Sequence, residues 1–459
     1  MPLRVKTHSK IQFLKGGGPQ PVALRTSPLA IVNCLPKQYS RVLDNEGLNH
    51  QELRLLKEHL LELTPVAPFE HADIGYVVPT KDPSSCTLDA TLSSIRKADQ
   101  GAPIVVVDDG SKNPQTVSLL AKRYDAKVIR LQSSHGPGFA RNLGAHHITN
   151  EILAFVDSDV ELGDDFYKLA SVFQVKDVLC CAPRVVSLKM KEAHLPSQTY
   201  FELDLGDSFS VVGTSKLAYL PSALLLIRKS TFDHVGGFDT SLFVGEDVDL
   251  VTKVTEHGLV LYLPEVRAFH EDPKGHTHTL GKSLGYGLSY GSLHKRYPKR
   301  ISILPLKIRD RAWFVGSNLL LGPVVASAFN ALVNSTVVTW KLKQSKTRIC
   351  TQDVLQIATV SMTQSAQELL QLWLRTCSLP LLLLSIVSSR ARRLLAAVVT
   401  ATVISMWKRP QETIGYRVAA DLGYSLGVVT SIVLELLNRT SQPNDQRVGI
   451  MDYVQGGSD

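Results

Sequence analysis

Short runs of apolar, mostly β-branched residues alternate with stretches of helical periodicity between residues 74 and 160. The expected strands are IGYVVPT (74–80), APIVVVDDGS (102–111), AKVIRLQ (126–132) and ILAFVDSD (152–159). The stretches LDATLSSIRKA (88–98) and QTVSLLAKRY (115–124) repeat apolar residues at helical spacing. Strands and helices that alternate through short connections are typical of a mostly parallel sheet with helices on both faces. The pattern therefore predicts an α/β, Rossmann-like domain whose ligands bind beyond the carboxyl ends of the strands.

The pattern changes on both sides of this region. Residues 1–72 combine two alternating runs around a Gly-rich turn with leucines at helical spacing from 50 to 63, which predicts a small α+β module. Residues 73–300 are expected to form the α/β domain, with a turn at Gly245 and a helix beginning near Asp247 in its second half. Residues 301–459 are apolar and basic, and their pattern predicts helices.

The C-terminal region carries signals for membrane contact. Residues 313–340 form a run of 28 without a charged side chain, which is long enough to cross a bilayer. The run also contains Gly322-Pro323 and three Asn, so a buried or interfacial hairpin is the alternative. Two later uncharged runs, 376–389 and 394–407, are about 14 residues each and favour amphipathic helices that lie on a membrane surface.

The net charge of +8 is concentrated in the same region. Residues 341–450 hold thirteen Lys or Arg and six Asp or Glu, so seven of the eight net positive charges lie there. A basic tail beside a nearly neutral remainder favours anionic lipid as partner, with a solvated basic surface as the alternative, and argues against nucleic acid. The six cysteines form no C-x-x-C pair, and the N-terminus lacks the apolar core of a signal peptide. We therefore expect the protein at the cytoplasmic face of the cell membrane, peripheral or with one or two transmembrane segments.

Acidic side chains follow the ends of two predicted strands. Asp157 and Asp159 are two residues apart, so on an extended segment both carboxylates lie on one side. Two converging anions repel each other unless a cation lies between them, and carboxylate oxygens suit Mg²⁺ or Mn²⁺, which in turn hold phosphate oxygens. Asp109, after the run 102–108, is placed to accept a hydrogen bond from a base or ribose edge. The alternative for Asp157 and Asp159 is a solvated acidic turn, and for Asp109 it is an ordinary Asp-Gly turn, which is common after a strand.

Three further positions are candidates for chemistry. The stretch GEDVDL (245–250) has three acids in six residues and could supply a general base, although acids are also favoured at any helix N-terminus. Arg141 lies near a predicted helix start, where it could steer a pyrophosphate. His270 follows an apolar run and could complete the shell of a metal, with a structural histidine as the alternative.

Taken in order, VVPTKD, VVVDDGS, GPGFARNLGA, FVDSDV, GGFD and GEDVDL resemble the motifs of inverting family-2 glycosyltransferases with the GT-A fold, over residues 74–298. The resemblance implies Asp247 as catalytic base. It also implies Mg²⁺ or Mn²⁺ as cofactor and a UDP-sugar as donor. One departure is the pair Lys81-Asp82, where the family more usually has an aromatic residue and Asn. The implied nucleotide-sugar residues are Pro79, Asp109, Arg141, Asp157 and Glu246, and the implied metal ligands are Asp157, Asp159 and His270.

A narrower resemblance concerns residues 219–258 and 270–298, which are similar to the glycosyltransferases of mycofactocin biosynthesis. It implies transfer of β-1,4-linked glucose from UDP-glucose onto a peptide-derived redox cofactor, building a β-linked glucan. The N-terminal module is similar to the small peptide-recognition domains of such pathways. A membrane lipid or polysaccharide acceptor is the alternative, although the Q-x-x-R-W signature of processive synthases is absent from the sequence. A non-catalytic protein that binds nucleotide sugars is the third reading.

Overall fold

The computed structural model describes residues 73–298 with short gaps (189–202, 207–208, 213–218, 243 and 272–275), the single residues 325, 329, 332, 333, 336 and 340, and residues 378–405 and 411–437. The predicted N-terminal module, 1–72, lies outside the described residues, as does most of the predicted span at 313–340.

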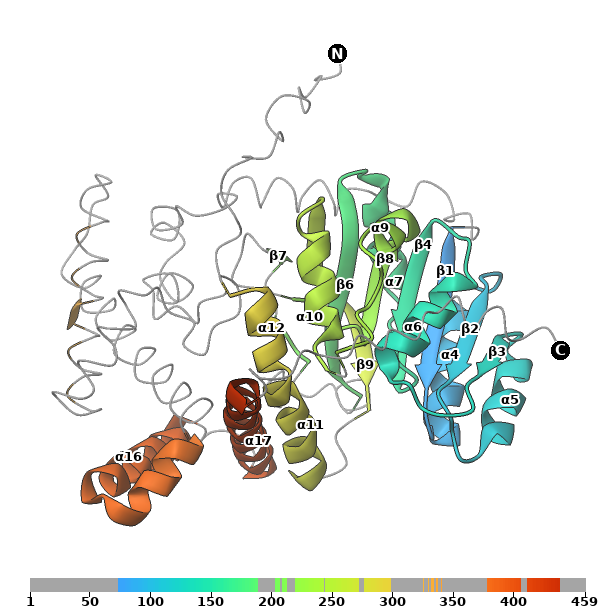
Figure 1. The fold of residues 1–459 in the computed structure, drawn as a ribbon. Helices are drawn as coiled ribbons and strands as arrows, with labels where there is room; N and C mark the ends of the chain where they lie inside the picture. The colour runs from blue at the N-terminus through green and yellow to red at the C-terminus, as the bar shows by residue number, and fades with distance from the viewer. Residues whose placement is uncertain are drawn as a thin grey trace.

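In the described residues, a nine-stranded sheet forms the centre of the fold (Figure 1). Its order is β3-β2-β1-β4-β8-β6-β9-β5, with β7 paired to β9. The strands are β1 (Ile74–Thr80), β2 (Ile104–Asp108), β3 (Lys127–Arg130), β4 (Ile152–Val156), β5 (Val160–Leu162), β6 (Val178–Ser187), β7 (Ser210–Val211), β8 (Leu224–Arg228) and β9 (Leu259–His270).

The sheet has a parallel half and a mixed half. The strands β3, β2, β1 and β4 are parallel neighbours, as the sequence predicts. Strand β8 runs antiparallel between β4 and β6, while β6 and β9 pair in parallel. The α/β fold class is thus confirmed. The four parallel strands place the carboxyl ends of β1, β2 and β4 at one edge, where Asp109 and Asp157 follow.

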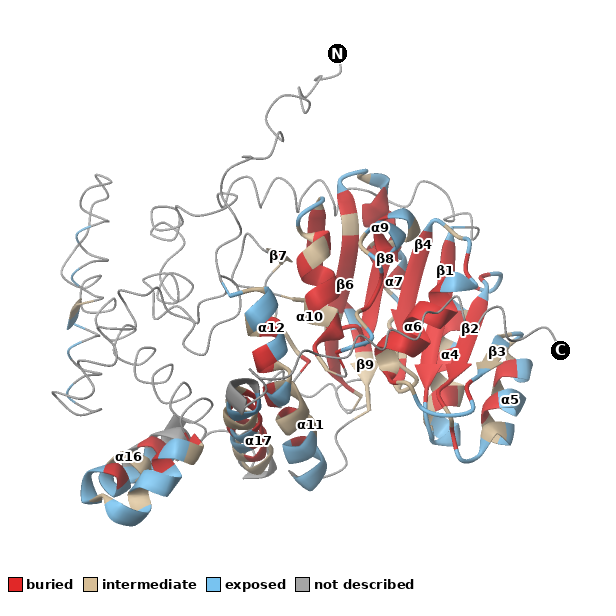
Figure 2. Cartoon of the chain, viewed as in Figure 1, coloured by how far each residue is buried: buried red, intermediate tan, exposed pale blue. Residues whose placement is uncertain are grey.

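Helices cover both faces of the sheet because side chains alternate along each strand. Tyr76 and Val78 of β1 belong to the apolar core beneath Leu88 of α4, whereas Val77 belongs to the core beneath Leu143 of α6. Figure 2 shows that β1, β2 and β4, which lie between these two layers, are buried along their whole length. The first face carries α4 (Ser85–Ala98), α5 (Pro114–Arg123), α7 (Phe166–Ser171) and the 3₁₀ turn η1 (Val172–Gln174); the second carries α6 (Pro137–His146), α9 (Lys229–His234) and α10 (Glu246–Val254).

The described part of the C-terminal region is helical, as expected. It contains α16 (Ser389–Ser405) and α17 (Gln411–Leu437), and α17 lies beside α11 (His276–Leu288) and α12 (Tyr290–Arg296), which follow the last strand (Figure 1). Within the residues that the structure describes, no helix combines the length and apolar character needed to cross a bilayer.

Candidate active site

The turn between β4 and β5 presents the paired acids. The backbone N–H of Asp157 donates to the carbonyl of Ala223 at 2.9 Å, and the N–H of Val160 donates to the carbonyl of Asp157 at 3.1 Å. These bonds fix the turn just beyond the carboxyl end of β4. Burial and the nearby Asp157 raise the pKa of Asp159, although His270 and Lys282 act in the opposite direction. A raised carboxyl pKa marks a place where added positive charge stabilises the ionised form.

His270, the last residue of β9, faces this turn. Its Nδ1 lies 2.6 Å from the carbonyl oxygen of Glu271, which can only accept, so Nδ1 carries the proton. In the neutral form of this ring the opposite nitrogen, Nε2, has a lone pair, and it lies 3.5 Å from Oδ1 of Asp159. A neutral imidazole nitrogen beside a carboxylate oxygen is a donor set that suits a divalent cation.

The predicted third ligand, Asp157, is engaged elsewhere. Its Oδ1 accepts a 2.6 Å hydrogen bond from Nη2 of Arg141. Across the described ranges, no three His, Cys, Asp or Glu side chains converge on one point as a complete metal site. The residues present therefore fit a cation held by Asp159 and His270, with Asp157 close by but paired to arginine.

Arg141 links two acidic motifs that are distant in sequence. It is 3% exposed, and its Nη1 donates to Oε1 of Glu246 at 2.9 Å while Nη2 contacts Asp157. Its guanidinium also lies 5.3 Å from the ring centre of Phe238. Burial disfavours its charge, but Asp157 and Glu246 outweigh that effect and raise its pKa. Arg141 thus joins the turn after β4 to the start of α10.

Asp247, the predicted base, occupies the first turn of α10. Gly245 caps the N-terminus of the helix with a φ of 88°, which glycine readily reaches, and three acids lie in the first turn. Burial and Glu246 raise the pKa of Asp247 to about 7, while Arg141 and backbone hydrogen bonds from Val248 and Ser222 act in the opposite direction. A carboxylate with this pKa is suited to take a proton near neutral pH.

Asp109 holds the loop that leads into α6. Its carboxylate accepts hydrogen bonds from the Ser134 hydroxyl at 2.7 Å and from the backbone N–H groups of His135 at 2.7 Å and Gly136 at 3.0 Å. The side chain therefore orients the start of the helix that carries Arg141. A carboxylate has about four acceptor sites, so contact with a nucleoside remains a prediction.

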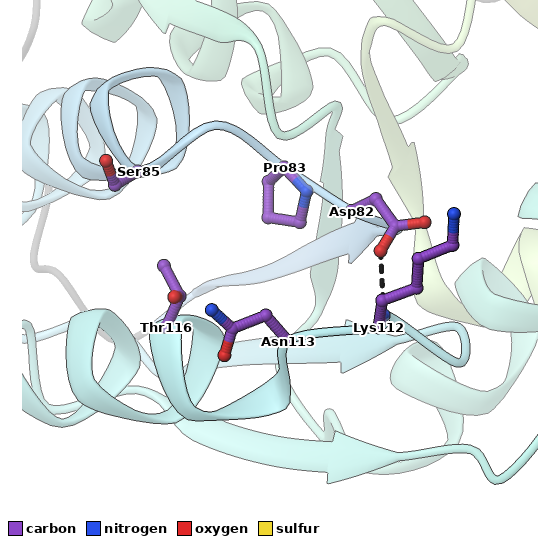
Figure 3. Close-up of a pocket in the computed structure, with 6 residues that line it drawn as sticks. All are labelled: Asp82, Pro83, Ser85, Lys112, Asn113 and Thr116. Carbon is purple, nitrogen blue, oxygen red and sulfur yellow. Dashed lines mark hydrogen bonds between the residues drawn. The ribbon is translucent and has the colours of Figure 1, made fainter.

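A small recess lies at the ends of β1 and β2, near the predicted nucleotide residue Pro79, which is buried within β1. It measures about 230 Å³. Figure 3 shows the Asp82 side chain in its wall, accepting a 2.7 Å hydrogen bond from the Lys112 backbone N–H. The recess is lined by Asp82, Pro83, Ser85, Lys112, Asn113 and Thr116. The last three belong to the loop and helix after β2, and no sequence motif identified them.

Two motif residues have structural partners that sequence reasoning missed. Asn142 donates from Nδ2 to the carbonyl of Phe238 at 2.7 Å and accepts from its N–H at 2.9 Å, which fixes the GGFD turn against α6. Asp249, completely buried in α10, accepts from the Tyr297 hydroxyl at 2.7 Å and pairs with Arg296 and Lys253. The third acid of GEDVDL therefore anchors the end of α12, a contact that its spacing alone did not reveal.

Comparison with known proteins identifies the family of the chain. The model of the family "Glycosyl transferase family 2" matches residues 76–236. The pre-mycofactocin glycosyltransferase of Mycobacterium tuberculosis is 31% identical over 378 residues, which cover 80% of this chain and 77% of that protein. The O-antigen biosynthesis protein RfbC of Myxococcus xanthus is 23% identical over 52% of this chain and 22% of that protein. Among solved structures, the mannosyltransferase PcManGT of Pyrobaculum calidifontis, in complex with GDP-Man and Mn²⁺, is 16% identical with a TM-score of 0.39, covering 83% of this chain and all of that one.

Proposed function

Because the chain belongs to glycosyltransferase family 2, we propose that it transfers glucose from UDP-glucose to a hydroxyl of a peptide-derived redox cofactor of the mycofactocin type. The observation that supports this reaction is the position of Asp247 in the fold. Its neighbour Glu246 and the turn of Asp157 and Asp159 are both hydrogen-bonded to Arg141. The acceptor class is supported by the similarity to the pre-mycofactocin enzyme, which extends over most of both chains.

The proposed reaction is a single displacement with inversion. Asp247 takes the proton of the acceptor hydroxyl while that oxygen attacks the anomeric carbon of the sugar. The bond between the anomeric carbon and the phosphate oxygen breaks on the opposite face, and UDP leaves with the electron pair. An α-linked donor therefore gives a β-linked product, and repeated transfer builds a β-linked glucan.

Asp159 and His270 are the residues proposed to hold a divalent cation, Mg²⁺ or Mn²⁺, which when bound would neutralise negative charge on the leaving diphosphate. Arg141 keeps Asp157 and Glu246 in place on either side of the site. Pro79 and Asp109 lie at the ends of β1 and β2, where we propose that the nucleoside binds.

The test is release of UDP from UDP-glucose with the peptide-derived acceptor present. We expect release to require the acceptor, to stop when EDTA removes divalent cations and to resume on addition of Mn²⁺. Asp247→Asn should lower turnover by about 10²–10⁴-fold with UDP-glucose affinity retained. Asp233→Asn, a change at an exposed α9 position, is the control. Turnover close to that of the unchanged protein in Asp247→Asn would remove Asp247 from the role of base.

A membrane-bound acceptor is the second candidate, because the described C-terminal residues expose an apolar surface. Five side chains between 382 and 387 are 49–82% exposed: Leu382, Leu383, Leu384, Ile386 and Val387. The exposed Arg390, Arg392 and Arg393 follow directly. Exposed leucines beside arginines suit the boundary between lipid tails and anionic headgroups. We propose peripheral attachment of the enzyme through this surface.

A further inference from the structure

Helix α11 contacts the loop that leads to Asp247, the proposed base. A Cβ on Gly285 would lie 3.3 Å from Cγ2 of Val244, three residues before Asp247. A Cβ on Gly245 would lie 3.2 Å from Oγ of Ser289, directly after α11. The side of α11 that passes through Gly285 and runs on to Ser289 therefore borders the start of α10.

Lys282 lies on the same side of α11, because residues three apart are neighbours on a helix surface. It is partly buried, and its positive charge acts to lower the pKa of Asp159. Among the described residues, Lys282 forms neither a hydrogen bond nor an ion pair, unlike Arg141. One side of α11 thus borders the loop before Asp247 through Gly285, and Lys282 lies one helical turn before Gly285 on that side.

The opposite side of α11 is held by α17 through contacts between backbones. A Cβ on Gly287 would lie 2.3 Å from the carbonyl oxygen of Tyr424, and one on Gly427 would lie 2.3 Å from the carbonyl oxygen of Leu284. A Cβ on Gly423 would meet the carbonyl oxygen of Leu280 at the same distance. No side chain fits between the two helices at these points, so α17 fixes the position of α11 closely (Figure 1).

From this arrangement we propose that α11 lines one side of the donor site and that Lys282 binds the diphosphate of the nucleotide sugar. Helix α17 keeps α11 in this position. The inference rests on the proposed function, since it assumes a nucleoside diphosphate donor. A lysine ammonium is a point charge that suits phosphate oxygens, and the leaving diphosphate gains negative charge as the glycosidic bond breaks.

Titration of the full-length protein with UDP and with uridine, both in Mg²⁺, tests Lys282. Lys282→Ala should weaken UDP binding about tenfold or more, because a hydrogen bond to a charged group is lost, and should leave uridine binding unchanged. Lys282→Arg should restore most of the UDP affinity, and Lys295→Ala, an exposed lysine of α12, is the control. Unchanged UDP affinity in Lys282→Ala, or an equal loss for uridine, would overturn the assignment.

A matched pair of glycines on α11 tests whether α17 holds α11 in position. Gly287→Ala should lower both the melting temperature and the UDP affinity, because its Cβ collides with the backbone of α17. Gly281→Ala, on the same helix, meets nothing within 4 Å and should change neither. If the two variants have the same melting temperature and the same UDP affinity, α17 does not hold α11 in position. If Gly287→Ala does not fold, the UDP and uridine titrations of the Lys282 variants still test the proposed contact between α11 and the diphosphate.

These results are distinguishable from failure of the proposed function. If the unchanged protein binds UDP but Asp247→Asn turns over normally, the mechanism fails while the diphosphate contact stands. If Asp247→Asn is inactive and Lys282→Ala binds UDP normally, the mechanism stands and the inference about α11 fails.

Discussion

Asp247 lies between two neighbours that act on its acidity in opposite directions, since Glu246 raises its pKa and Arg141 lowers it. The sequence identified Asp157, Asp159, Arg141 and Asp247 as chemically important. It did not show that Arg141 bonds to Asp157 and Glu246, which are 16 and 105 residues away from it. Residue type and spacing along one strand or helix predict local chemistry, whereas contacts across the sheet depend on the completed fold.

The pKa of Asp247 predicts the pH dependence of the reaction. Because a base must be ionised, kcat/KM should fall about tenfold per pH unit below about 7. A rate that stays constant between pH 5 and 8 would contradict Asp247 as base.

The same shift affects stability. Folded Asp247 holds its proton more tightly than an unfolded aspartate with pKa 3.8, so its ionisation destabilises the fold as pH rises from about 4 to about 7. The stability of Asp247→Asn relative to the unchanged protein should therefore increase over that range, by about 3 kcal/mol. Urea unfolding of both proteins at pH 5 and pH 8 measures the change.

Removal of Arg141 should be costly, because two carboxylates would lose their buried partner. Arg141→Met should destabilise the fold by about 3–5 kcal/mol in urea unfolding. It should also raise the pKa of Asp247 further, which moves the acid limb of any residual activity to higher pH. Arg141→Lys keeps the charge but cannot bond both carboxylates in the same fork geometry, so we expect an intermediate loss. Full stability in Arg141→Met would show that the ion pairs do not hold the site together.

At the scale of helices and strands, the sequence predicted the parallel half of the sheet well. The expected strands at 74–80 and 152–159 and the expected helices at 88–98 and 115–124 correspond to β1, β4, α4 and α5. The antiparallel position of β8 between β4 and β6 was not predicted. An apolar run shows that a strand is buried, but its neighbours and direction are set by pairing with strands far away in sequence.

The contact between α10 and α12 yields a prediction at this scale. Asp249 is buried and depends on partners from the end of α12, so Tyr297→Phe should lower the free energy of unfolding by about 1–2 kcal/mol. Tyr167→Phe, on the surface of α7 where the side chain is 44% exposed, should have little effect. Urea unfolding compares the two variants, and equal stability would show that this hydroxyl does not anchor α12.

For the molecule as a whole, the fold connects its C-terminal region to the site through the α11–α17 contact and also presents lipid-suited residues at 382–393. The sequence predicted a basic, apolar tail on a membrane surface. It did not predict that α17 packs backbone to backbone against α11, because single glycines 140 residues apart carry no pairing signal of their own. In the proposed arrangement, the C-terminal region supplies both the residues that contact the membrane and the helix, α17, that supports the donor site.

Attachment can be measured by sedimentation with vesicles. The full-length protein should bind phosphatidylglycerol vesicles more strongly than neutral phosphatidylcholine vesicles, and binding should weaken as salt increases because exposed arginines supply part of the attraction. The double change Ile386→Asp with Val387→Asp should abolish binding, since both side chains are more than 70% exposed and would enter the lipid boundary. Leu119→Asp, at an equally exposed apolar position on α5, should leave binding intact. Binding that survives the double change would move the lipid contact elsewhere on the chain, whereas loss of binding with UDP affinity retained would separate attachment from the chemistry of the site.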